Sequence, residues 1–465
     1  MSSEDYKFSV KTILEATGGV LAQGDPQASF AGVSTDSRSI RSGELFFALK
    51  GEKFDGSQFI AEAAKKGGTG GVVEKEIPGI LAETIPVIKV RDTLQALGDL
   101  ASFWRERHPI PLVAITGSNG KTTTKEMLAG ILGESYKVLK NPGNFNNLIG
   151  LPLSLLKLNS QDQVAVLEMG MNRKGEIRRL TQIAKPDLAI LTNISPVHLE
   201  GLKSLKGIME AKGELLDVME AQGRLILNAD DPRVVELSER FRGAKTSFGI
   251  TSLAHWVATD ISTRGDGGVS FRLNGPIGKT SISLSIMGRH QVYNALAASA
   301  AASHLAVGLK EIKRGLGAFQ PPPMRMELII LGQGIKIIND VYNANPKSVE
   351  SALSTLEEVT EGRKIAVLGD MWELGAYAPQ AHTEAGRLVK EKGVALLFLL
   401  GEFSRYVAQG ATDAGMNPKA IFIGKDHQGL SHQLARSLKK GDCVLIKGSR
   451  IMKMEKVIED LRNQL

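Results

Sequence analysis

The segment 110–130 holds the residues whose types and spacing point most directly to chemistry. A β-branched apolar run ends at Gly117, a Gly-Lys-Thr step follows at Gly120, Lys121 and Thr122, and good helix formers begin immediately. A strand, a glycine turn and a helix N-terminus make a phosphate cradle, because backbone N–H groups and the positive end of the helix dipole point at one anion. Lys121 adds a charge for the terminal phosphates, and the Thr122 hydroxyl can bind Mg²⁺. The segment therefore predicts binding of a nucleoside triphosphate.

The spacing of this loop is shorter than the general pattern. The usual loop reads G-x-x-x-x-G-K-[ST], whereas Gly117 is the nearest upstream glycine here and leaves G-x-x-G-K-T. Glycine turns between a strand and a helix also occur in α/β units that bind nothing. A lysine followed by a threonine at the start of the helix favours phosphate binding, without identifying a second substrate.

Several other apolar runs end in polar residues. Runs at 112–116, 164–170, 188–195 and 224–231 are typical of buried parallel strands, whose carboxyl ends collect ligands. The polar residues at or just past these ends are Glu168, Asn193, His198, Asn228 and Asp230.

The residues alone allow two interpretations of Glu168 and of His198, and one of Lys212. Glu168 could order Mg²⁺ or be a solvated carboxylate at a strand end. His198 could be a ligand, although a lone histidine is more often a packing or hydrogen-bonding residue. Lys212, in GIMEAKGELL, reads from the residues alone as an exposed helical lysine.

Composition limits the class of protein. The chain has 465 residues, 42% of them hydrophobic and 23% charged, which predicts a globular enzyme of two to four domains. The single cysteine excludes an internal disulfide framework and Cys-based zinc sites, so a reduced cytoplasm is expected. Neither a signal peptide pattern nor an apolar run long enough to span a membrane is found. The net charge of +7 is scattered and only 5% of residues are aromatic, which favours a small anionic substrate over nucleic acid.

The chain divides into three blocks, 1–108, 109–322 and 323–465. A helix begun by Asp92 ends before Pro109, and three prolines at 321–323 mark the second boundary. The first block also predicts a helix over 57–68. The second alternates strands and helices, with an antiparallel addition near 255–286 and an alanine-rich helix after it. The third opens with a hairpin and resumes βα alternation. The expected fold is α/β in three domains: a small N-terminal domain, a central P-loop domain with a parallel sheet, and a C-terminal Rossmann-like domain.

Five motifs resemble the Mur ligase family of ATP-dependent amide ligases of cell-wall synthesis. They are ITGSNGKTTTKEM, LEMGMNRKGEI, LTNISPVHLEG with EAKGE downstream, GRHQVYNALAA and PPPMRMELI. The segments 34–60, 141–156, 339–353 and 367–375 are most similar to members that join D-alanyl-D-alanine to UDP-N-acetylmuramoyl-tripeptide. The DNPR motif of the sister enzyme that adds the third residue of the peptide is absent from the sequence.

The resemblance implies a nucleotide site and two Mg²⁺ sites. Thr122 and Glu168 would order one Mg²⁺, while His198 and a carbamylated Lys212 would serve the second. These two, with Lys121 and Glu168, would be the catalytic residues. The remaining nucleotide contacts would be the loop residues Gly117, Ser118, Asn119, Gly120, Lys121, Thr122 and Thr123, with Asn294 for adenine, Asp340 for ribose and Arg325 reaching ATP from the third domain.

The resemblance also implies substrate contacts in all three blocks. The uridine diphosphate would be held by Ser37, Arg38, Phe46, Lys50 and Asp55, and its sugar end by Asn144, Asn146 and Asn147. The incoming dipeptide would meet Asn343, Asn345 and Ser348. Turn formation is the alternative role of the asparagine clusters, and Asn-Pro at 345–346 suits a turn.

The implied reaction makes an acyl phosphate from the tripeptide carboxylate and ATP, and then an amide, releasing ADP and phosphate. Closure about 321–323 would bring Arg325 to the nucleotide and exclude water. A cytoplasmic monomer is expected. Three other functions stay open from the residues: an amide ligase acting on another peptidyl or folyl substrate, a P-loop ATPase switch without ligation, and a basic ATPase that binds nucleic acid.

Overall fold

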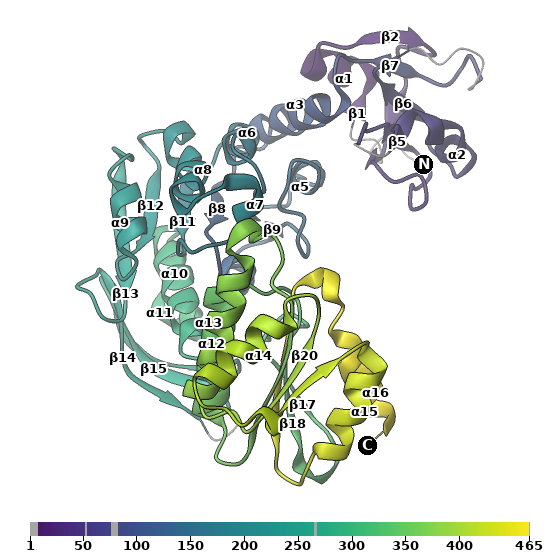
Figure 1. Cartoon of the computed structure of the whole chain (residues 1–465). Helices are drawn as coiled ribbons and strands as arrows, with labels where there is room; N and C mark the ends of the chain where they lie inside the picture. The colour runs from purple at the N-terminus through teal and green to yellow at the C-terminus, as the bar shows by residue number, and fades with distance from the viewer. Residues whose placement is uncertain (1–7, 52–53, 76–81, 265–266, 465) are drawn as a thin grey trace.

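The computed structural model describes residues 8–51, 54–75, 82–264 and 267–464. Three sheets of five, nine and six strands follow one another along the chain, and the expected three-part α/β fold is confirmed (Figure 1). No helix in these ranges is long and apolar enough to cross a membrane.

The N-terminal part has strand order β2-β7-β6-β5-β4, with the small pair β1-β3 beside it. Its strands are β1 (Phe8–Ser9), β2 (Val20–Gln23), β3 (Ser29–Phe30), β4 (Gly32–Ser34), β5 (Glu44–Phe47), β6 (Gly70–Val73) and β7 (Val87–Lys89). Its helices are α1 (Val10–Thr17), the 3₁₀ turn η2 (Gly56–Phe59), α2 (Ile60–Lys65) and α3 (Thr93–Glu106).

Of two local predictions in this part, the cap at Asp92 is confirmed and the length of the helix over 57–68 is corrected. Asp92 caps α3 by accepting the N–H of Gln95 at 2.8 Å, as its place before the helix predicts. The helix expected over 57–68 is shorter. It begins as a 3₁₀ turn because Asp55 accepts the N–H of Ser57, and it ends at Lys65, before Gly67 at φ +106°.

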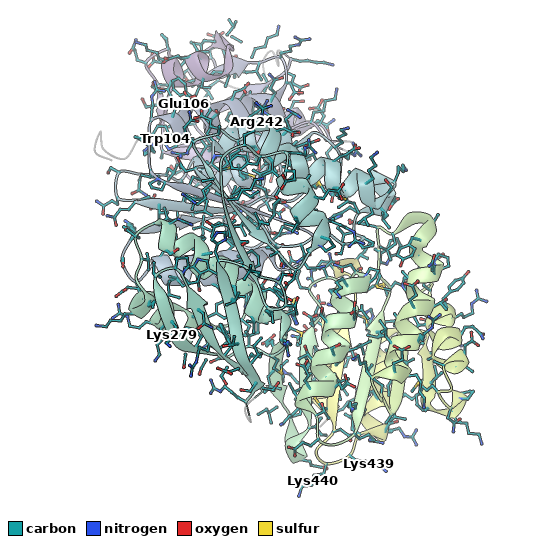
Figure 2. The ribbon with its side chains drawn as sticks, turned by 90° about the vertical axis from the view of Figure 1, so that its left-hand side faces the viewer. Trp104, Glu106, Arg242, Lys279, Lys439 and Lys440 are labelled. Atoms are coloured by element: carbon teal, nitrogen blue, oxygen red, sulfur yellow. The ribbon has the colours of Figure 1, made fainter. Side chains whose placement is uncertain are left out.

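The long helix α3 joins the N-terminal part to the central sheet. Phe8 packs on Trp104 with ring centroids 4.6 Å apart, while the Trp104 indole N–H donates to the carbonyl of Leu158 at 3.0 Å. Trp104 and Glu106 lie near one end of the molecule in Figure 2, and Lys439 and Lys440 lie at the other. The helix is therefore packed on both sides, and the N-terminal sheet is held well away from the C-terminal sheet (Figure 1).

The central sheet has the order β16-β15-β14-β13-β12-β11-β8-β10-β9, parallel from β9 to β14 and antiparallel beyond. Its strands are β8 (Leu112–Thr116), β9 (Val138–Lys140), β10 (Val164–Glu168), β11 (Leu188–Leu191), β12 (Arg224–Asn228), β13 (Ala244–Gly249), β14 (Trp256–Thr263), β15 (Val269–Gly275) and β16 (Gly278–Leu284). Its helices are α4 (Lys121–Leu132), α5 (Gly150–Leu155), α6 (Glu176–Ala184), α7 (Leu199–Leu202), α8 (Leu205–Val218), α9 (Pro232–Ser238), α10 (His290–His304) and α11 (Leu309–Gly317).

Alternate residues of the central strands pack into two different hydrophobic cores, one on each face of the sheet. Val113 and Ile115 of β8 pack with α4 and α10, in a core that continues into the C-terminal domain. Leu112 and Ala114 of the same strand pack with α3, α6 and α8. Both faces of the sheet are thus covered, so the polar residues at the strand ends gather along one edge.

The C-terminal sheet has the order β17-β18-β22-β19-β20-β21, with only β17 antiparallel among the described strands. Its strands are β17 (Glu327–Ile330), β18 (Lys336–Asp340), β19 (Lys364–Gly369), β20 (Leu396–Leu400), β21 (Ile421–Gly424) and β22 (Cys443–Lys447). Its helices are α12 (Pro346–Val359), α13 (Ala378–Glu391), α14 (Ser404–Asp413), α15 (His427–Ser437) and α16 (Glu455–Gln464), with short 3₁₀ turns η3 (Gly332–Gly334), η4 (Gly375–Tyr377), η5 (Pro418–Ala420) and η6 (Arg450–Met452).

Candidate active site

A cavity of about 1040 Å³ lies where the carboxyl edge of the central sheet faces the C-terminal domain. All five strand-end residues singled out in the sequence border it: Glu168, Asn193, His198, Asn228 and Asp230. The predicted site residues that also border it are Ser118, Asn119, Gly120, Lys121, Thr122, Thr123, Asn144, Asn146, Asn294, Arg325, Asp340, Asn343, Asn345 and Ser348.

Two glycines of the phosphate loop have no room for a side chain. A Cβ on Gly117, at φ +145°, would lie 2.0 Å from the Thr192 hydroxyl, and one on Gly120, at φ +82°, would lie 2.3 Å from Asn294 Oδ1. The Lys121 ammonium donates to the carbonyl of Gly117 at 2.9 Å. The lysine is therefore folded over the loop whose N–H groups would meet a phosphate.

Glu168 is held beside this loop. It is 2% exposed, so the solvated interpretation of this carboxylate is wrong. The Thr122 hydroxyl donates to one carboxylate oxygen at 2.6 Å and the Asn146 amide to the other at 2.7 Å. Two hard oxygen groups thus lie together at the start of α4, which is the donor chemistry that Mg²⁺ prefers.

Lys212 is buried on α8, which rules out the exposed interpretation of this lysine. Burial lowers its pKa well below the usual value, and the positive charge of Lys121 lowers it further. Lys212 does not border the cavity, and it has no hydrogen bond or ion pair within the described ranges. Both effects favour the neutral amine of Lys212 over its ammonium form.

His198 faces the C-terminal domain as well as the cavity. Its Nδ1 lies 2.5 Å from a carboxylate oxygen of Glu373, and this hydrogen bond is the main cause of a lowered pKa of Glu373. No contact joins His198 to Lys212 in the part of the chain that the structure describes. The two residues lie on different elements, His198 at the start of α7 and Lys212 within α8.

Asn294 is buried at the start of α10, so it is not a helix surface residue. Its amide oxygen accepts from the Thr124 hydroxyl at 3.2 Å, and its amide N–H donates to Gln291 at 2.8 Å. Gln291 in turn donates to Nε2 of His290 at 2.7 Å, so this nitrogen is an acceptor. Burial lowers the pKa of His290 to about 4.

The C-terminal domain places its polar residues on the opposite wall. Arg325 lies over the ring of Tyr342 at 3.8 Å. Asp340 forms an ion pair of 2.5 Å with Lys447, whose ammonium also donates to the carbonyl of Asn343 at 2.9 Å. Lys447 is buried, and nothing in the sequence singled it out except a lysine at the end of an apolar run.

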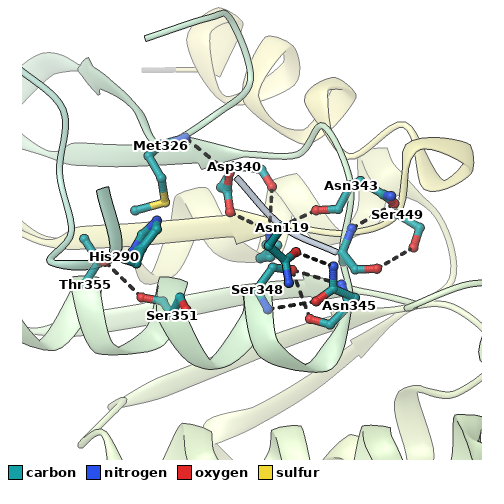
Figure 3. Close-up of polar contacts among 12 residues, drawn as sticks. Asn119, His290, Met326, Asp340, Asn343, Asn345, Ser348, Ser351, Thr355 and Ser449 are labelled. Atoms are coloured by element: carbon teal, nitrogen blue, oxygen red, sulfur yellow. Dashed lines mark hydrogen bonds and ion pairs between the residues drawn. The ribbon is translucent and has the colours of Figure 1, made fainter. Parts of the chain in front are cut away.

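Asn345 and Ser348 are occupied in a helix cap. Each side chain bonds the backbone N–H of the other at the start of α12, which is a capping box. Asn345 also donates to Asn119 of the phosphate loop at 2.7 Å, across the two domains (Figure 3). Asn345 therefore begins a helix and not a turn, and the same side chain reaches the nucleotide loop.

The residues predicted to hold the uridine diphosphate, and Asn147 of the sugar end, do not border the cavity. Arg38 is 82% exposed and pairs with Asp36 at 2.8 Å, while Asp55 caps η2 and its backbone bridges to Lys50. Ser37 and Phe46 are buried, Phe46 within a small core of the N-terminal sheet. Asn147 accepts the N–H of Gly150 at 2.8 Å and so begins α5.

Comparison with known proteins places all three parts of the chain in one family. Models of the Mur ligase catalytic domain, middle domain and glutamate ligase domain match residues 29–105, 115–302 and 324–450. A UDP-N-acetylmuramoyl-tripeptide–D-alanyl-D-alanine ligase of Bacillus subtilis is 36% identical over 457 residues, 98% of each chain. A crystal structure of MurF from Acinetobacter baumannii superposes with a TM-score of 0.92 at 33% identity, covering 99% of this chain and 100% of that one. The MurF ligase of Thermotoga maritima in complex with ADP gives 0.83 at 28% identity, covering 93% and 97%.

Proposed function

The chain belongs to the Mur ligase family and is an ATP-dependent ligase, and we propose that it joins D-alanyl-D-alanine to UDP-N-acetylmuramoyl-tripeptide. The products are the pentapeptide precursor of peptidoglycan, ADP and phosphate. We place the reaction in the cytoplasm and assign it to a monomer, in three functional units at 1–108, 109–322 and 323–465.

One observation carries the proposal. The phosphate loop with Lys121, Thr122 and Glu168 faces a wall of the C-terminal domain that holds Arg325 and Asp340, across a single cavity. A nucleotide bound in this cavity would contact both domains, so the domain that brings the dipeptide is also the one that encloses ATP. An ATPase switch without ligation has no need of this second wall.

The first chemical step forms the acyl phosphate. A carboxylate oxygen of the tripeptide attacks the γ-phosphorus of ATP, the bond from that phosphorus to the β–γ bridging oxygen breaks, and ADP leaves. Negative charge spreads over the transferred phosphoryl oxygens, where the Lys121 ammonium and the loop N–H groups stabilise it. Arg325 adds a second cation from the C-terminal domain.

The second step forms the amide. The amine of D-alanyl-D-alanine attacks the acyl carbon, loses a proton, and expels phosphate. Water would compete for the same carbon, so enclosure between the two domains protects the acyl phosphate. Asn343, Asn345 and Ser348 lie on the wall from which the dipeptide would approach, and we assign them to that end of the site.

The oxygen groups beside the loop fit Mg²⁺. Thr122 and Glu168 would hold one ion together with nucleotide oxygens and water, since Mg²⁺ is usually bound by one or two protein groups. Within the described ranges no cluster of three or more His, Cys, Asp or Glu side chains could hold a metal by itself. When bound, Mg²⁺ would neutralise phosphate charge. A neutral Lys212 amine can react with CO₂, and we assign the resulting carbamate and His198 to a second ion.

The sugar nucleotide would be bound by the N-terminal part and by the asparagines of the loop before α5. We assign Ser37, Arg38, Phe46, Lys50 and Asp55 to the uridine diphosphate, and Asn144, Asn146 and Asn147 to its sugar end. Arg38 is exposed and can pair with a diphosphate. Phe46 is buried, so it can support this site only by packing beneath it.

ADP release tests the proposal. The purified chain is given Mg-ATP with UDP-N-acetylmuramoyl-tripeptide alone, with D-alanyl-D-alanine alone, and with both. The ligase should release ADP at a steady rate only with both substrates, and the pentapeptide should form in equal amount. Equal ADP release without the dipeptide, or with neither substrate, would contradict the assignment.

A further inference from the structure

Glu373 lies in the segment between β19 and η4 and contacts the central domain twice. Its carboxylate oxygen is 2.5 Å from Nδ1 of His198, and its backbone carbonyl accepts the N–H of Glu200 at 3.1 Å. Gly375, two residues further on, also approaches the backbone of Glu200. One short segment of the C-terminal domain is therefore seated on the start of α7.

The backbone at this contact is unusual on both sides. His198 has φ +53° and Glu373 has φ +65°, and neither is a glycine. Residues with side chains adopt this left-handed conformation rarely, and they keep it where surrounding contacts require it. The conformation aims the two side chains at each other across the domain boundary.

The hydrogen bond fixes which nitrogen of His198 carries the proton. A carboxylate can only accept, so Nδ1 must donate. In the neutral ring, Nε2 is then left with its lone pair, and His198 borders the cavity that holds the phosphate loop. A histidine serving a metal or a phosphate commonly has its other nitrogen held in this way by a carboxylate.

We propose that Glu373 is a positioning residue, which holds His198 in the Nδ1–H tautomer and does so only while the C-terminal domain is docked. This rests on the proposed function, in which His198 acts on the phosphate side of the site. Among the described residues, Glu373 is the one hydrogen-bonding partner of the His198 ring. Docking of the domain that brings the dipeptide therefore also prepares the residue that serves ATP.

The state of the ring can be measured without substrates. Nitrogen-15 NMR of the full chain, with labelled histidine and at pH 8, reports which imidazole nitrogen is protonated. The His198 signals are those missing from a His198→Gln variant. We expect Nδ1–H in the unmodified chain, and a change toward Nε2–H in Glu373→Ala. Glu373→Gln should keep Nδ1–H because its amide oxygen still accepts.

Turnover gives the second measurement. We expect kcat for ADP release with both substrates to fall about 10- to 100-fold in Glu373→Ala, with the KM for ATP within about twofold, and to fall less in Glu373→Gln. Glu200→Ala is the matched control. This carboxylate lies at the same contact, but only its backbone N–H is used, so turnover and tautomer should both stay unchanged.

The two measurements distinguish a positioning role of Glu373 from a docking contact. An unmodified chain with Nε2–H, or a Glu373→Ala chain that keeps Nδ1–H, overturns the inference whatever the turnover. A loss of turnover with an unchanged tautomer would make Glu373 a docking contact only. The NMR result needs no ligand, so it decides the inference even if the proposed substrates prove wrong.

Discussion

At the scale of single residues, the site is defined by charged groups kept away from water. Lys212, Lys447 and Glu168 are all about 2% exposed, and each lies within reach of the phosphate loop or the opposite wall. Burying a charge without a partner is expensive, so such groups are paired or neutral. Lys447 is paired with Asp340, and Glu168 accepts hydrogen bonds from Thr122 and Asn146. Burial lowers the pKa of Lys212, which favours its neutral amine.

The neutral ring of His290 should make stability depend on pH. Burial lowers its pKa from 6.5 to about 4, so between these values the unfolded chain binds a proton that the folded chain does not. The contribution of His290 to the free energy of unfolding should thus be complete above pH 6.5, and it should be lost as the pH falls toward 4. Between pH 7 and pH 5, we expect the free energy of unfolding to fall by about 2 kcal/mol less in His290→Gln than in the unmodified chain.

Urea unfolding of both chains at the two pH values measures this difference. His432→Gln is the control, because His432 is exposed and lies far along the sequence from the cavity residues around His290. If the free energy of unfolding falls by the same amount in the unmodified chain and in His290→Gln, this ring does not cause the loss of stability in acid.

At the scale of elements, one buried lysine holds the loop that carries the asparagines of the sugar end. The Lys125 ammonium, from α4, donates to the carbonyls of Asn141 at 2.6 Å and Gly143 at 3.2 Å. Asn141 itself exchanges hydrogen bonds with the backbone of Glu168. The phosphate helix, the strand end and the loop 141–147 are thus one connected unit.

Replacing Lys125 should loosen this unit. In Lys125→Met the buried carbonyl of Asn141 loses its donor, which costs about 1–3 kcal/mol of folding free energy. We expect the KM for UDP-N-acetylmuramoyl-tripeptide to rise about tenfold, because the loop that carries Asn144 and Asn146 loses its anchor to α4. Lys140→Met is the matched control, since Lys125 and Lys140 both pair with Glu126 but Lys140 is exposed. An unchanged KM in Lys125→Met would mean that the loop does not bind this substrate.

The strands could be predicted from the sequence because each is an apolar run that ends in polar residues. The runs at 112–116, 164–170 and 188–195 became β8, β10 and β11, and the hairpin at the start of the C-terminal domain is β17–β18. The pairs that make the site could not be predicted. Glu373 meets His198 over 175 residues of sequence, and Lys447 meets Asp340 over 107. Such contacts depend on how whole domains pack, which no local pattern records.

At the scale of the whole molecule, the site exists only where two domains meet. Asn345 reaches the phosphate loop, Glu373 reaches His198, and one apolar core runs from the central sheet into the C-terminal helices. Substrates must nevertheless enter this cavity and products must leave it. We therefore expect the two domains to separate during each cycle, about the prolines at 321–323.

A reversible crosslink tests this motion. A Cβ on Gly375 would lie 3.6 Å from the Cα of Glu200, which suits a disulfide between cysteines at these two positions. The single natural cysteine, Cys443, is buried, so the double variant Glu200→Cys, Gly375→Cys can be oxidised without competing pairs. We expect oxidation to lower turnover at least about tenfold, because the closed cavity neither admits the dipeptide nor releases ADP. A reducing agent should restore turnover, and each single variant should be insensitive to oxidation. Full turnover in the oxidised double variant would show that the domains stay docked throughout, and that substrates enter by another path.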